Sequence, residues 1–443
     1  MMISQTMIVK NEERHVAKAL GWGKTIMVEQ IVVDTGSGDN TASLAEKAGA
    51  KVYYIPWEDD FSKAKNAAIE HCKGDWIAFL DADEYVREED VQKLPGIIEK
   101  ADRKGYDSIS ASLLELDDEG KVFGGGTLVR FFKNRADIRY HRCIHEQLSN
   151  KKEYDATQEI TIYHTGYSAS EQKRKPFDRN LRLIRKELSR NPKDDEMLGY
   201  LGDEYRAQNQ YRNAVEVYQK AIRCFPANIE ESNQRAAVTL ERLLQLHVFQ
   251  LAWQKDPNGK LSDMKNVSLQ DVENLYQKAI QYFPKEPDYA YLMGEYYFGD
   301  EQYDKAASFY GDALEKLSKY GFQNRALMLF PRIGDTYEKY AFSLFSLDHA
   351  KEAVEIAVQC VKENHQAMLA LKTLLLAFTK GGENEATVQA ILQFLLKIYD
   401  NNNLRDKMIL YYSSRDARCP ELEKAITKLF SKEEQQALHD NHA

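Results

Sequence analysis

The sequence predicts a chain of two parts, an α/β domain with a mostly parallel sheet followed by an all-α solenoid of paired helices. Three observations support this prediction. Strand-like and helical runs alternate over the first 80 residues, strand signals stop near residue 193, and a helical repeat begins there. Alternating strands and helices with short connections are typical of a parallel sheet covered on both faces. The 443 residues also exceed the usual length of one domain.

In the α/β part, residues that typically begin or end helices lie at the ends of two of the predicted helices. Four strands are expected, at residues 3–9, 28–34, 51–56 and 76–84. Three helices connect them, at residues 11–20, 39–49 and 62–72. Asp39 or Thr41 is expected to cap the second helix, while Gly49 ends it and Gly74 closes the third. In such a sheet, ligands bind outside the carboxyl ends of the strands.

The segment between residues 91 and 167 is less regular. It predicts a hairpin at 116–126 and strands at 127–133 and 159–164, and a charged helix at 170–190 then leads out of the domain. Gly124 to Gly126 are interpreted as hairpin residues and not as a phosphate loop, because no helix and no GKS or GKT follows them.

The second part matches the tetratricopeptide repeat pattern. The first copy is carried by Leu198, Leu201, Gly202, Tyr205, Ala214, Tyr218, Ala221 and Pro226. A second copy is carried by Ala290, Met293, Gly294, Tyr297, Ala306, Tyr310 and Ala313. Between them, Tyr276, Ala279 and Pro284 fit a unit with an enlarged loop at 254–268, and a degenerate unit follows around Gly334 and Tyr337. Helices from about Gln366 either cap the solenoid or form a homodimer contact.

Composition excludes several classes of protein. Charged residues at 29% and hydrophobic residues at 43% exclude wholesale disorder. The net charge of -9 argues against a general nucleic-acid binder. No apolar run approaches the roughly 20 residues of a membrane span, and charged residues from Lys10 onward exclude a secretory signal. Five cysteines at long spacings, without a CxxC, predict reduced thiols in the cytoplasm and neither a disulfide framework nor a zinc site.

Acidic residues follow two of the predicted strands. Asp81 and Asp83 form an Asp-x-Asp after a buried strand, where paired carboxylates favour Mg²⁺ or Mn²⁺ bound together with a substrate diphosphate. Asp34 ends another strand, where a carboxylate can accept hydrogen bonds from a ribose or a base. A surface acidic turn and a turn aspartate are the structural alternatives. The GxGxxG fingerprint is not satisfied by residues 36–40, which argues against NAD chemistry.

The ordered runs at 7–13, 31–41 and 59–84 resemble the GT-A fold glycosyltransferases of family 2, which use nucleotide-sugar donors and usually invert the anomeric centre. The resemblance covers residues 1 to 170. The further runs at 130–134, 143–148 and 163–168 and the attached repeats resemble one bacterial branch of this family in particular. That branch includes the S-glycosyltransferases of glycocin (sublancin-type) biosynthesis. Those enzymes attach a hexose, typically from UDP-glucose, to a cysteine of a precursor peptide.

The resemblance implies a donor site, a metal site and an acceptor-side base. The donor site would include Val9, Asn11, Asp34, Lys65, Asp81 and Arg130. At Lys65, the family pattern usually has Arg before Asn66. Metal ligands would be Asp81, Asp83 and His164, although a core histidine and a solvated arginine are the alternatives for His164 and Arg130.

His145 and Glu146 form a base-like pair on the acceptor side, where an inverting displacement needs a group that takes the acceptor proton. We favour Glu146 as the base, and a salt bridge to Arg139 or Arg142 is its structural alternative.

The predicted organisation is therefore a GT-A domain at 1–170, a helical linker at 171–192, a repeat domain at 193–365 and a helical segment at 366–443. The expected partners are a UDP-hexose and, through the repeats, a peptide or protein acceptor. Ser or Thr acceptors, a cell-surface glycan and a non-catalytic binding scaffold stay open as alternatives. A nucleotidyltransferase could share the fold and the metal site, but residues 6–15 lack its glycine-rich basic loop.

Overall fold

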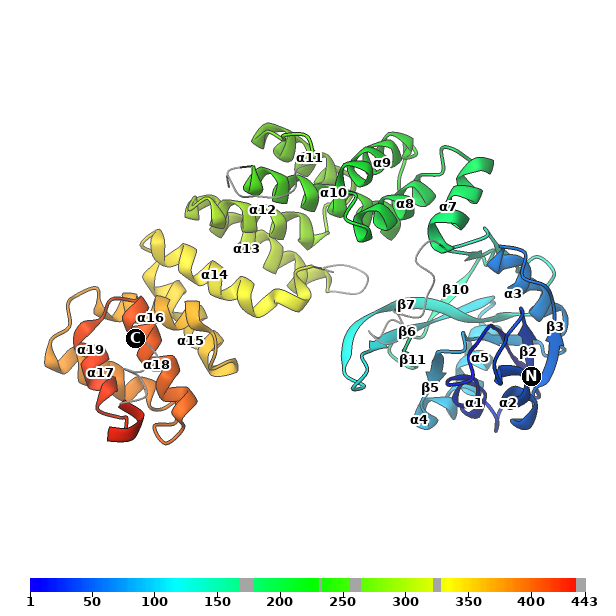
Figure 1. Cartoon of the computed structure of the whole chain (residues 1–443), viewed down its shortest axis with the longest axis horizontal. Helices are drawn as coiled ribbons and strands as arrows, with labels where there is room; N and C mark the ends of the chain where they lie inside the picture. The colour runs from blue at the N-terminus through cyan, green and yellow to red at the C-terminus, as the bar shows by residue number, and fades with distance from the viewer. Residues whose placement is uncertain (167–178, 231–232, 255–263, 322–327, 436–443) are drawn as a thin grey trace. The chain divides into compact units, whose positions relative to one another are not determined.

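The computed structural model describes the chain except for residues 167–178, 231–232, 255–263, 322–327 and 436–443. The chain divides into two compact units, Met1–Cys224 and Phe225–Ala443 (Figure 1), and each unit is described here by itself. Among the described residues, no helix combines the length and apolar character that crossing a bilayer requires.

A mixed sheet forms the centre of the first unit. Within the described residues, nine strands join it, in the order β3-β2-β1-β4-β7-β6-β11-β5, with β10 paired to β6. The strands are β1 (Ile3–Val9), β2 (Glu29–Asp34), β3 (Lys51–Tyr54), β4 (Trp76–Phe79), β5 (Glu84–Val86), β6 (Ser108–Leu116), β7 (Val122–Lys133), β10 (Glu153–Asp155) and β11 (Thr161–His164). Strands β1 to β4 are parallel, as predicted, whereas β7 runs antiparallel to β4 and β6. This is the Rossmann-like, GT-A type of sheet that the sequence predicts.

Helices cover both faces of this sheet. They are α1 (Val16–Gly21), α2 (Thr41–Lys47), α3 (Phe61–Glu70), α4 (Glu88–Val91) and α5 (Leu94–Arg103). Side chains alternate along β2, so Ile31 and Val33 pack with Ala68 of α3 on one face. Val32 packs on the other face, in a cluster that includes Ala45 of α2. A continuous apolar strand is therefore needed here, because both of its faces are buried.

Local structure departs from the sequence expectation at three points. The first helix begins at Val16 and not at Asn11, because Asn11 has a left-handed backbone with φ of 58°. Asn40 occupies the N-cap position of the second helix but makes no side-chain capping hydrogen bond, and it is Asp39, one of the two predicted cap residues, that accepts a hydrogen bond from the Thr41 backbone N–H at 3.0 Å. The predicted strand 76–84 ends at Phe79, and the Asp-x-Asp lies in the loop before β5.

The three consecutive glycines lie within β7, which confirms the hairpin interpretation. Gly124, Gly125 and Gly126 stand opposite Glu115, Leu114 and Leu113 of β6. A Cβ on Gly125 would lie 2.5 Å from the Leu113 carbonyl oxygen. The glycines therefore permit a close approach of the two strands.

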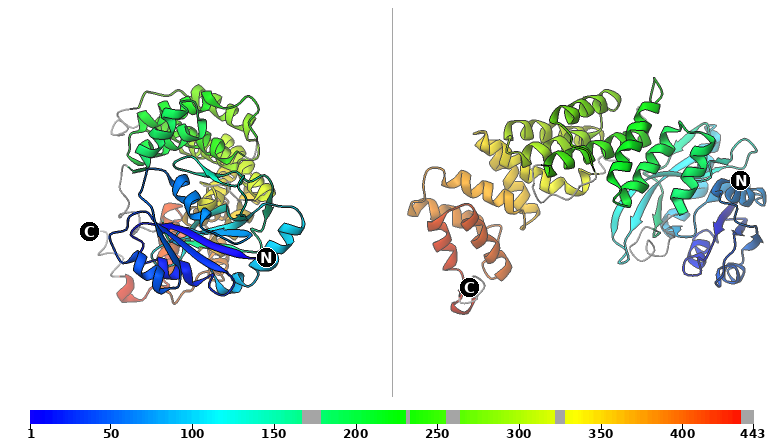
Figure 2. Two further views of the ribbon diagram at one scale, coloured as in Figure 1. Left: turned by 90° about the vertical axis from the view of Figure 1, so that its right-hand side faces the viewer. Right: turned by 45° about the horizontal axis from the view of Figure 1, so that its top comes forward.

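From Arg179 onward, the elements that the structure describes are helices (Figures 1 and 2). The first unit includes α7 (Arg179–Arg190), α8 (Asp195–Ala207) and α9 (Tyr211–Cys224). The helix expected at 170–190 is thus present from Arg179, and its earlier residues lie outside the described ones. The second unit is formed by α10 (Gln234–Trp253), α11 (Leu269–Tyr282), α12 (Pro287–Gly299), α13 (Tyr303–Tyr320), α14 (Ile333–Ser346), α15 (Ala350–Glu363), α16 (Met368–Thr379), α17 (Glu385–Leu395), α18 (Leu404–Asp416) and α19 (Pro420–Thr427). The enlarged loop predicted at 254–268 falls largely on residues 255–263, which are not described.

The two repeat copies that match the pattern most fully share one contact between their helices, in which a tyrosine ring packs against a glycine. A Cβ on Gly202 would lie 2.3 Å from the Tyr218 ring, and a Cβ on Gly294 would lie 2.7 Å from the Tyr310 ring. In both pairs the tyrosine hydroxyl donates to the acidic residue that follows the glycine. Glycine is needed at these positions because the ring of the second helix lies directly on the backbone of the first. The degenerate copy lacks this contact, since a Cβ on Gly334 would meet no atom within 4 Å.

Candidate active site

The loops after β1 and β2 are bonded to each other at the carboxyl edge of the sheet. Val9 stands opposite Asp34 in the parallel pair, and its side chain is buried in the core. The Asn11 side chain accepts a hydrogen bond from the Gly38 N–H at 2.8 Å. Asp34 is 2% exposed and its Oδ1 accepts from the N–H groups of Gly36 and Ser37, each at 2.7 Å. Asp34 therefore also organises the turn, a role that the sequence analysis assigned to Asp39.

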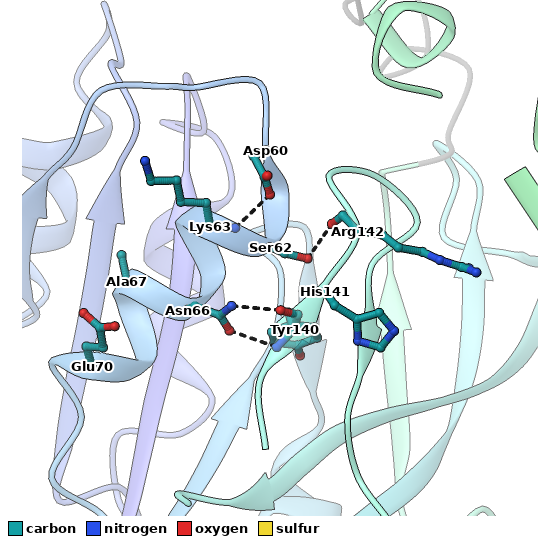
Figure 3. A pocket seen from close by; sticks show the side chains of 9 residues that line it. All are labelled: Asp60, Ser62, Lys63, Asn66, Ala67, Glu70, Tyr140, His141 and Arg142. Carbon is teal, nitrogen blue, oxygen red and sulfur yellow. Dashed lines mark hydrogen bonds between the residues drawn. The ribbon is translucent and has the colours of Figure 1, made fainter. Parts of the chain in front are cut away.

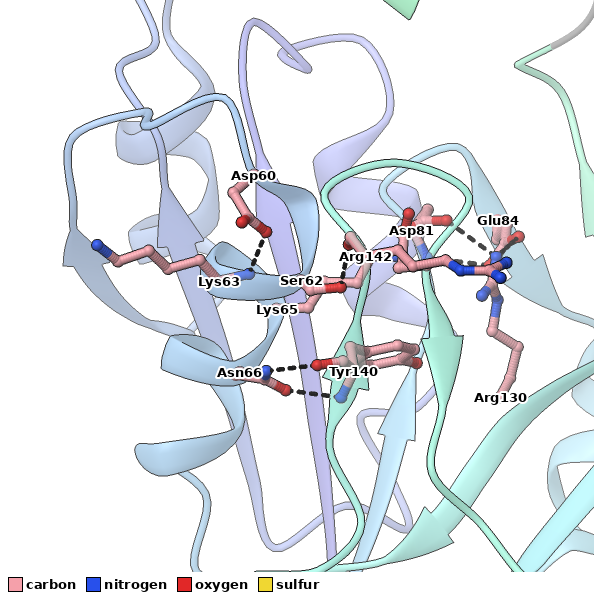
Figure 4. Close-up of polar contacts among 11 residues, drawn as sticks. Asp60, Ser62, Lys63, Lys65, Asn66, Asp81, Glu84, Arg130, Tyr140 and Arg142 are labelled. Carbon is pink, nitrogen blue, oxygen red and sulfur yellow. Dashed lines mark hydrogen bonds and ion pairs between the residues drawn. The ribbon is translucent and has the colours of Figure 1, made fainter. Parts of the chain in front are cut away.

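A buried cluster of ions lies beside this edge (Figure 4). The Lys65 ammonium, on α3, is 3.4 Å from Asp81 Oδ1 and 2.5 Å from Glu146 Oε1. Arg130, on β7, is 2.9 Å from Asp81 Oδ2 and 2.6 Å from Glu84 Oε1. The structure thus brings together four residues predicted from sequence, Lys65, Asp81, Arg130 and Glu146. Glu146 forms a salt bridge, but to Lys65 and not to Arg139 or Arg142.

The charges in this cluster shift one another's pKa. Burial by itself would raise the pKa of Asp81, but Lys65 and Arg130 outweigh it and lower the pKa to about 2. Burial would likewise lower the pKa of Lys65, whereas Asp81 and Glu146 raise it above its ordinary value. Burial raises the pKa of Glu84, and the Asp81 charge adds to this rise while Arg130 opposes it. Both cations are therefore held in their charged forms.

Asp83 and His164 form a separate pair at the end of β11. His164 Nε2 lies 3.4 Å from Asp83 Oδ2, and the Thr165 N–H donates to the Asp83 carbonyl at 3.0 Å. A Cβ on Gly166 would lie 1.8 Å from Asp83 Oδ2, so this position requires glycine. Burial by itself would lower the pKa of His164, but the hydrogen bond and charge of Asp83 raise it.

This pair fits part of a divalent cation site. In the described part of the chain, no three His, Cys, Asp or Glu side chains converge as a metal-binding group. The Asp83 carboxylate is nonetheless a suitable donor for Mn²⁺ or Mg²⁺, which commonly takes its other ligands from water and substrate phosphate. Asp81 faces Lys65 and Arg130, so the two carboxylates of the Asp-x-Asp have different surroundings.

His145 and Glu146 point in different directions. Residues 142–145 form a bend in which His145 has φ of 49°. The His145 ring stacks on Tyr200 of α8 with ring centroids 3.5 Å apart, whereas Glu146 reaches Lys65. Of the two candidate bases, Glu146 is therefore the one that shares the ion cluster with Asp81.

Sequence analysis missed two members of the cluster. Glu84 is 3% exposed and binds both Arg130 and the Asp81 N–H. Tyr140 is 7% exposed, and its ring centroid lies 5.2 Å from the Lys65 ammonium. Glu84 directly follows the Asp-x-Asp at the start of a buried strand, which was a usable signal. Tyr140 carried no such signal, because it reaches α3 only through the tertiary fold.

A surface hollow of about 480 Å³ lies between α3 and strand β8 (Tyr140–His141) (Figure 3). Asn66 lies in its wall and binds the Tyr140 backbone through both its oxygen and its nitrogen. Its lining includes charged groups such as Asp60, Lys63 and Arg142. None of the predicted metal ligands lines this hollow.

The site lies at the carboxyl edge of the parallel strands of a mixed, Rossmann-like sheet of the GT-A type. Residues 9–180 match the model of the family "Glycosyl transferase family 2". The N-terminal part of this chain is therefore similar to the family 2 glycosyltransferases.

Individual proteins are also similar to this chain. A TPR repeat-containing protein of Synechococcus elongatus is 32% identical over 45% of this chain and 51% of its own. The SPbeta prophage-derived glycosyltransferase SunS of Bacillus subtilis is 26% identical over 48% of this chain and 52% of its own. The matches thus span about half the length of these relatives. Among solved structures, S. aureus TarS 1-349 in complex with UDP-GlcNAc is 14% identical, with a TM-score of 0.34 over 63% of this chain and 91% of that chain.

Proposed function

We propose that this chain is an inverting, metal-dependent glycosyltransferase that moves a hexose from a UDP-sugar to a cysteine thiol of a peptide acceptor, with UDP-glucose as the first donor to test. The observation that carries the proposal is the pair of cations, buried Lys65 and half-buried Arg130, beside Asp83 and His164 in a domain that matches family 2. Similarity to SunS, which is itself named a glycosyltransferase, supports the same activity.

Each group has a role in this proposal. Asp34 and Asn11 contact the nucleoside, and Val9 shapes the floor of that site. Lys65 and Arg130 attract the diphosphate, because fixed cations in a buried site act more strongly on an anion than cations in water. Asp83 and His164 would hold Mg²⁺ or Mn²⁺, which when bound neutralises charge on the departing diphosphate. Asp81 keeps the two basic side chains charged and oriented.

Glu146 accepts the acceptor proton in this proposal, and the acceptor is a thiol. Its carboxylate lies 2.5 Å from the Lys65 ammonium and shares that cation with Asp81. A cysteine thiol, with an ordinary pKa of about 8.5, needs less assistance than a serine hydroxyl. Ser or Thr acceptors and a glycan acceptor are outcomes of the test below.

The repeats bind the acceptor in this proposal, because solenoids of paired helices commonly bind extended segments. The protein is proposed to act in the cytoplasm, in agreement with its unpaired cysteines.

The decisive experiment incubates the full chain with a panel of UDP-hexoses, Mg²⁺ or Mn²⁺ and two matched peptides that differ only in Cys or Ser. We expect UDP release and a hexose on the Cys peptide, detected by mass spectrometry. Asp83→Asn should lower kcat by roughly 100-fold, comparable to the loss of one electrostatic stabiliser. Neither transfer nor hydrolysis of any UDP-hexose with either cation would remove the enzyme proposal and favour a binding scaffold.

A further inference from the structure

We propose that helix α8 is part of the catalytic machinery, because the ion pair of Arg142 with Glu196 and Asp194 positions the turn that carries Glu146. This inference rests on the proposed function of Glu146. Arg142 and Glu196 thereby become positioning residues for the acceptor-side base. All the contacts involved lie within the first compact unit.

The turn before Glu146 is not one that its own sequence favours. Arg142 has φ of 73° and His145 has φ of 49°, so two non-glycine residues in four adopt left-handed backbone. Such conformations cost roughly 1–2 kcal/mol each and persist only where surrounding contacts hold them. The turn therefore depends on groups outside it.

Helices α7 and α8 supply those contacts on one side. The Arg142 guanidinium forms an ion pair with Glu196, and lies 3.1 Å from Asp194 Oδ2 at the start of α8. The Cys143 N–H donates to Glu187 Oε2 of α7 at 2.9 Å. The Cys143 side chain is fully buried, in a cluster with Leu183 of α7 and Met197 of α8. His145 completes this side through its stack on Tyr200.

Helix α3 holds the turn on the other side. The Phe61 N–H donates to the Cys143 carbonyl at 3.0 Å, and the Ser62 hydroxyl donates to the Arg142 carbonyl. The same helix carries Lys65, the partner of Glu146. The turn is thus fixed between α3 and the α7–α8 pair, and Glu146 leaves it toward the ion cluster. A shift of this turn by about 1 Å is enough to slow a reaction by as much as 100-fold.

The test compares Glu196→Gln with Glu216→Gln in the full chain. Glu216 is a matched control, because it is an ion-paired glutamate on the neighbouring helix α9 but is 59% exposed. Glu196→Gln should lower kcat for transfer by roughly 10- to 100-fold and leave the Kd for UDP unchanged, whereas Glu216→Gln should match the wild type. Arg142→Lys, which loses the forked geometry of the guanidinium, should behave as Glu196→Gln does.

A double variant separates positioning from general damage. If Glu196 acts through Glu146, then Glu146→Gln/Glu196→Gln should be no slower than Glu146→Gln alone, because the base is already lost. A rate lowered by the product of the two single effects would overturn the inference. Wild-type kcat in both Glu196→Gln and Arg142→Lys would overturn it as well.

Cys143 gives a readout that does not need activity. It is fully buried, and burial is the main cause that raises the pKa of its thiol to about 12, so it should resist alkylation in the wild type. Glu196→Gln should accelerate alkylation of Cys143, measured by peptide mass spectrometry, while Glu216→Gln should not. Unchanged protection of Cys143 in Glu196→Gln would refute the inference that the Arg142–Glu196 ion pair holds the turn, even if no sugar is transferred. If Glu146→Gln is fully active while Glu196→Gln accelerates Cys143 labelling, Glu146 is not the base, but the ion pair still holds the turn.

Discussion

Lys65→Met should destabilise the first unit strongly, because it removes a buried cation that pairs with two carboxylates. Lys65 is 4% exposed and lies within 3.4 Å of both Asp81 and Glu146. Breaking a buried ion pair by removing one partner costs about 3–5 kcal/mol. For a unit of this size, each kcal/mol lowers Tm by roughly 2–4 °C, so we expect a fall of roughly 6–20 °C.

Lys63→Met is the matched control, two residues away on the same helix. Its ammonium also lies 2.5 Å from a carboxylate, that of Glu58, but both side chains are at least half exposed. An exposed pair contributes about 0–1 kcal/mol, so Tm should fall by less than about 4 °C. Burial is therefore the main difference that the comparison measures.

Thermal unfolding followed by tryptophan fluorescence suits this comparison, because three of the four tryptophans, Trp22, Trp57 and Trp76, belong to the first unit. Lys65→Arg restores the cation and the residue usual in the family pattern, so it should recover most of the lost stability. Equal shifts for Lys65→Met and Lys63→Met would refute the reasoning that the buried cluster is held together by its central cation.

Three further predictions concern other parts of the chain. Asp34→Ala should raise the Kd for UDP by roughly tenfold or more, since a hydrogen bond to a charged group is lost; unchanged affinity in calorimetry would exclude it from the donor site. Gly294→Ala should lower the free energy of unfolding by about 1–3 kcal/mol, because the added Cβ clashes with Tyr310. Gly334→Ala meets no neighbouring atom, so it should leave the free energy of unfolding unchanged or raise it by up to about 1 kcal/mol. Similar denaturation midpoints for the two variants would contradict this prediction. Burial lowers the pKa of His247, so the second unit should lose stability as pH falls below about 6.5; His247→Gln should flatten that dependence in denaturant titrations.

Much of the fold could be read from the sequence because its signals are local. The alternation of short apolar strands and helices predicted the parallel strands β1 to β4, and each lies where its apolar run is. The repeat pattern predicted the helix pairs, and in two of them a glycine of the first helix meets a tyrosine of the second. The Asp-x-Asp could be placed at a sheet edge because it directly follows a buried strand.

Tertiary structure decided what those residues contact. Lys65 and Glu146 are 81 positions apart, and Arg142 and Glu196 are 54 apart, so no local periodicity links either pair. The different surroundings of Asp81 and Asp83 likewise depend on which strands bring Arg130 and His164 to the loop. The sequence by itself determined which segments become strands and helices and which acidic residues end at the sheet edge. The packing of α3 and α8 against one turn determined which side chains meet there, because contacts between distant segments form only when the chain folds.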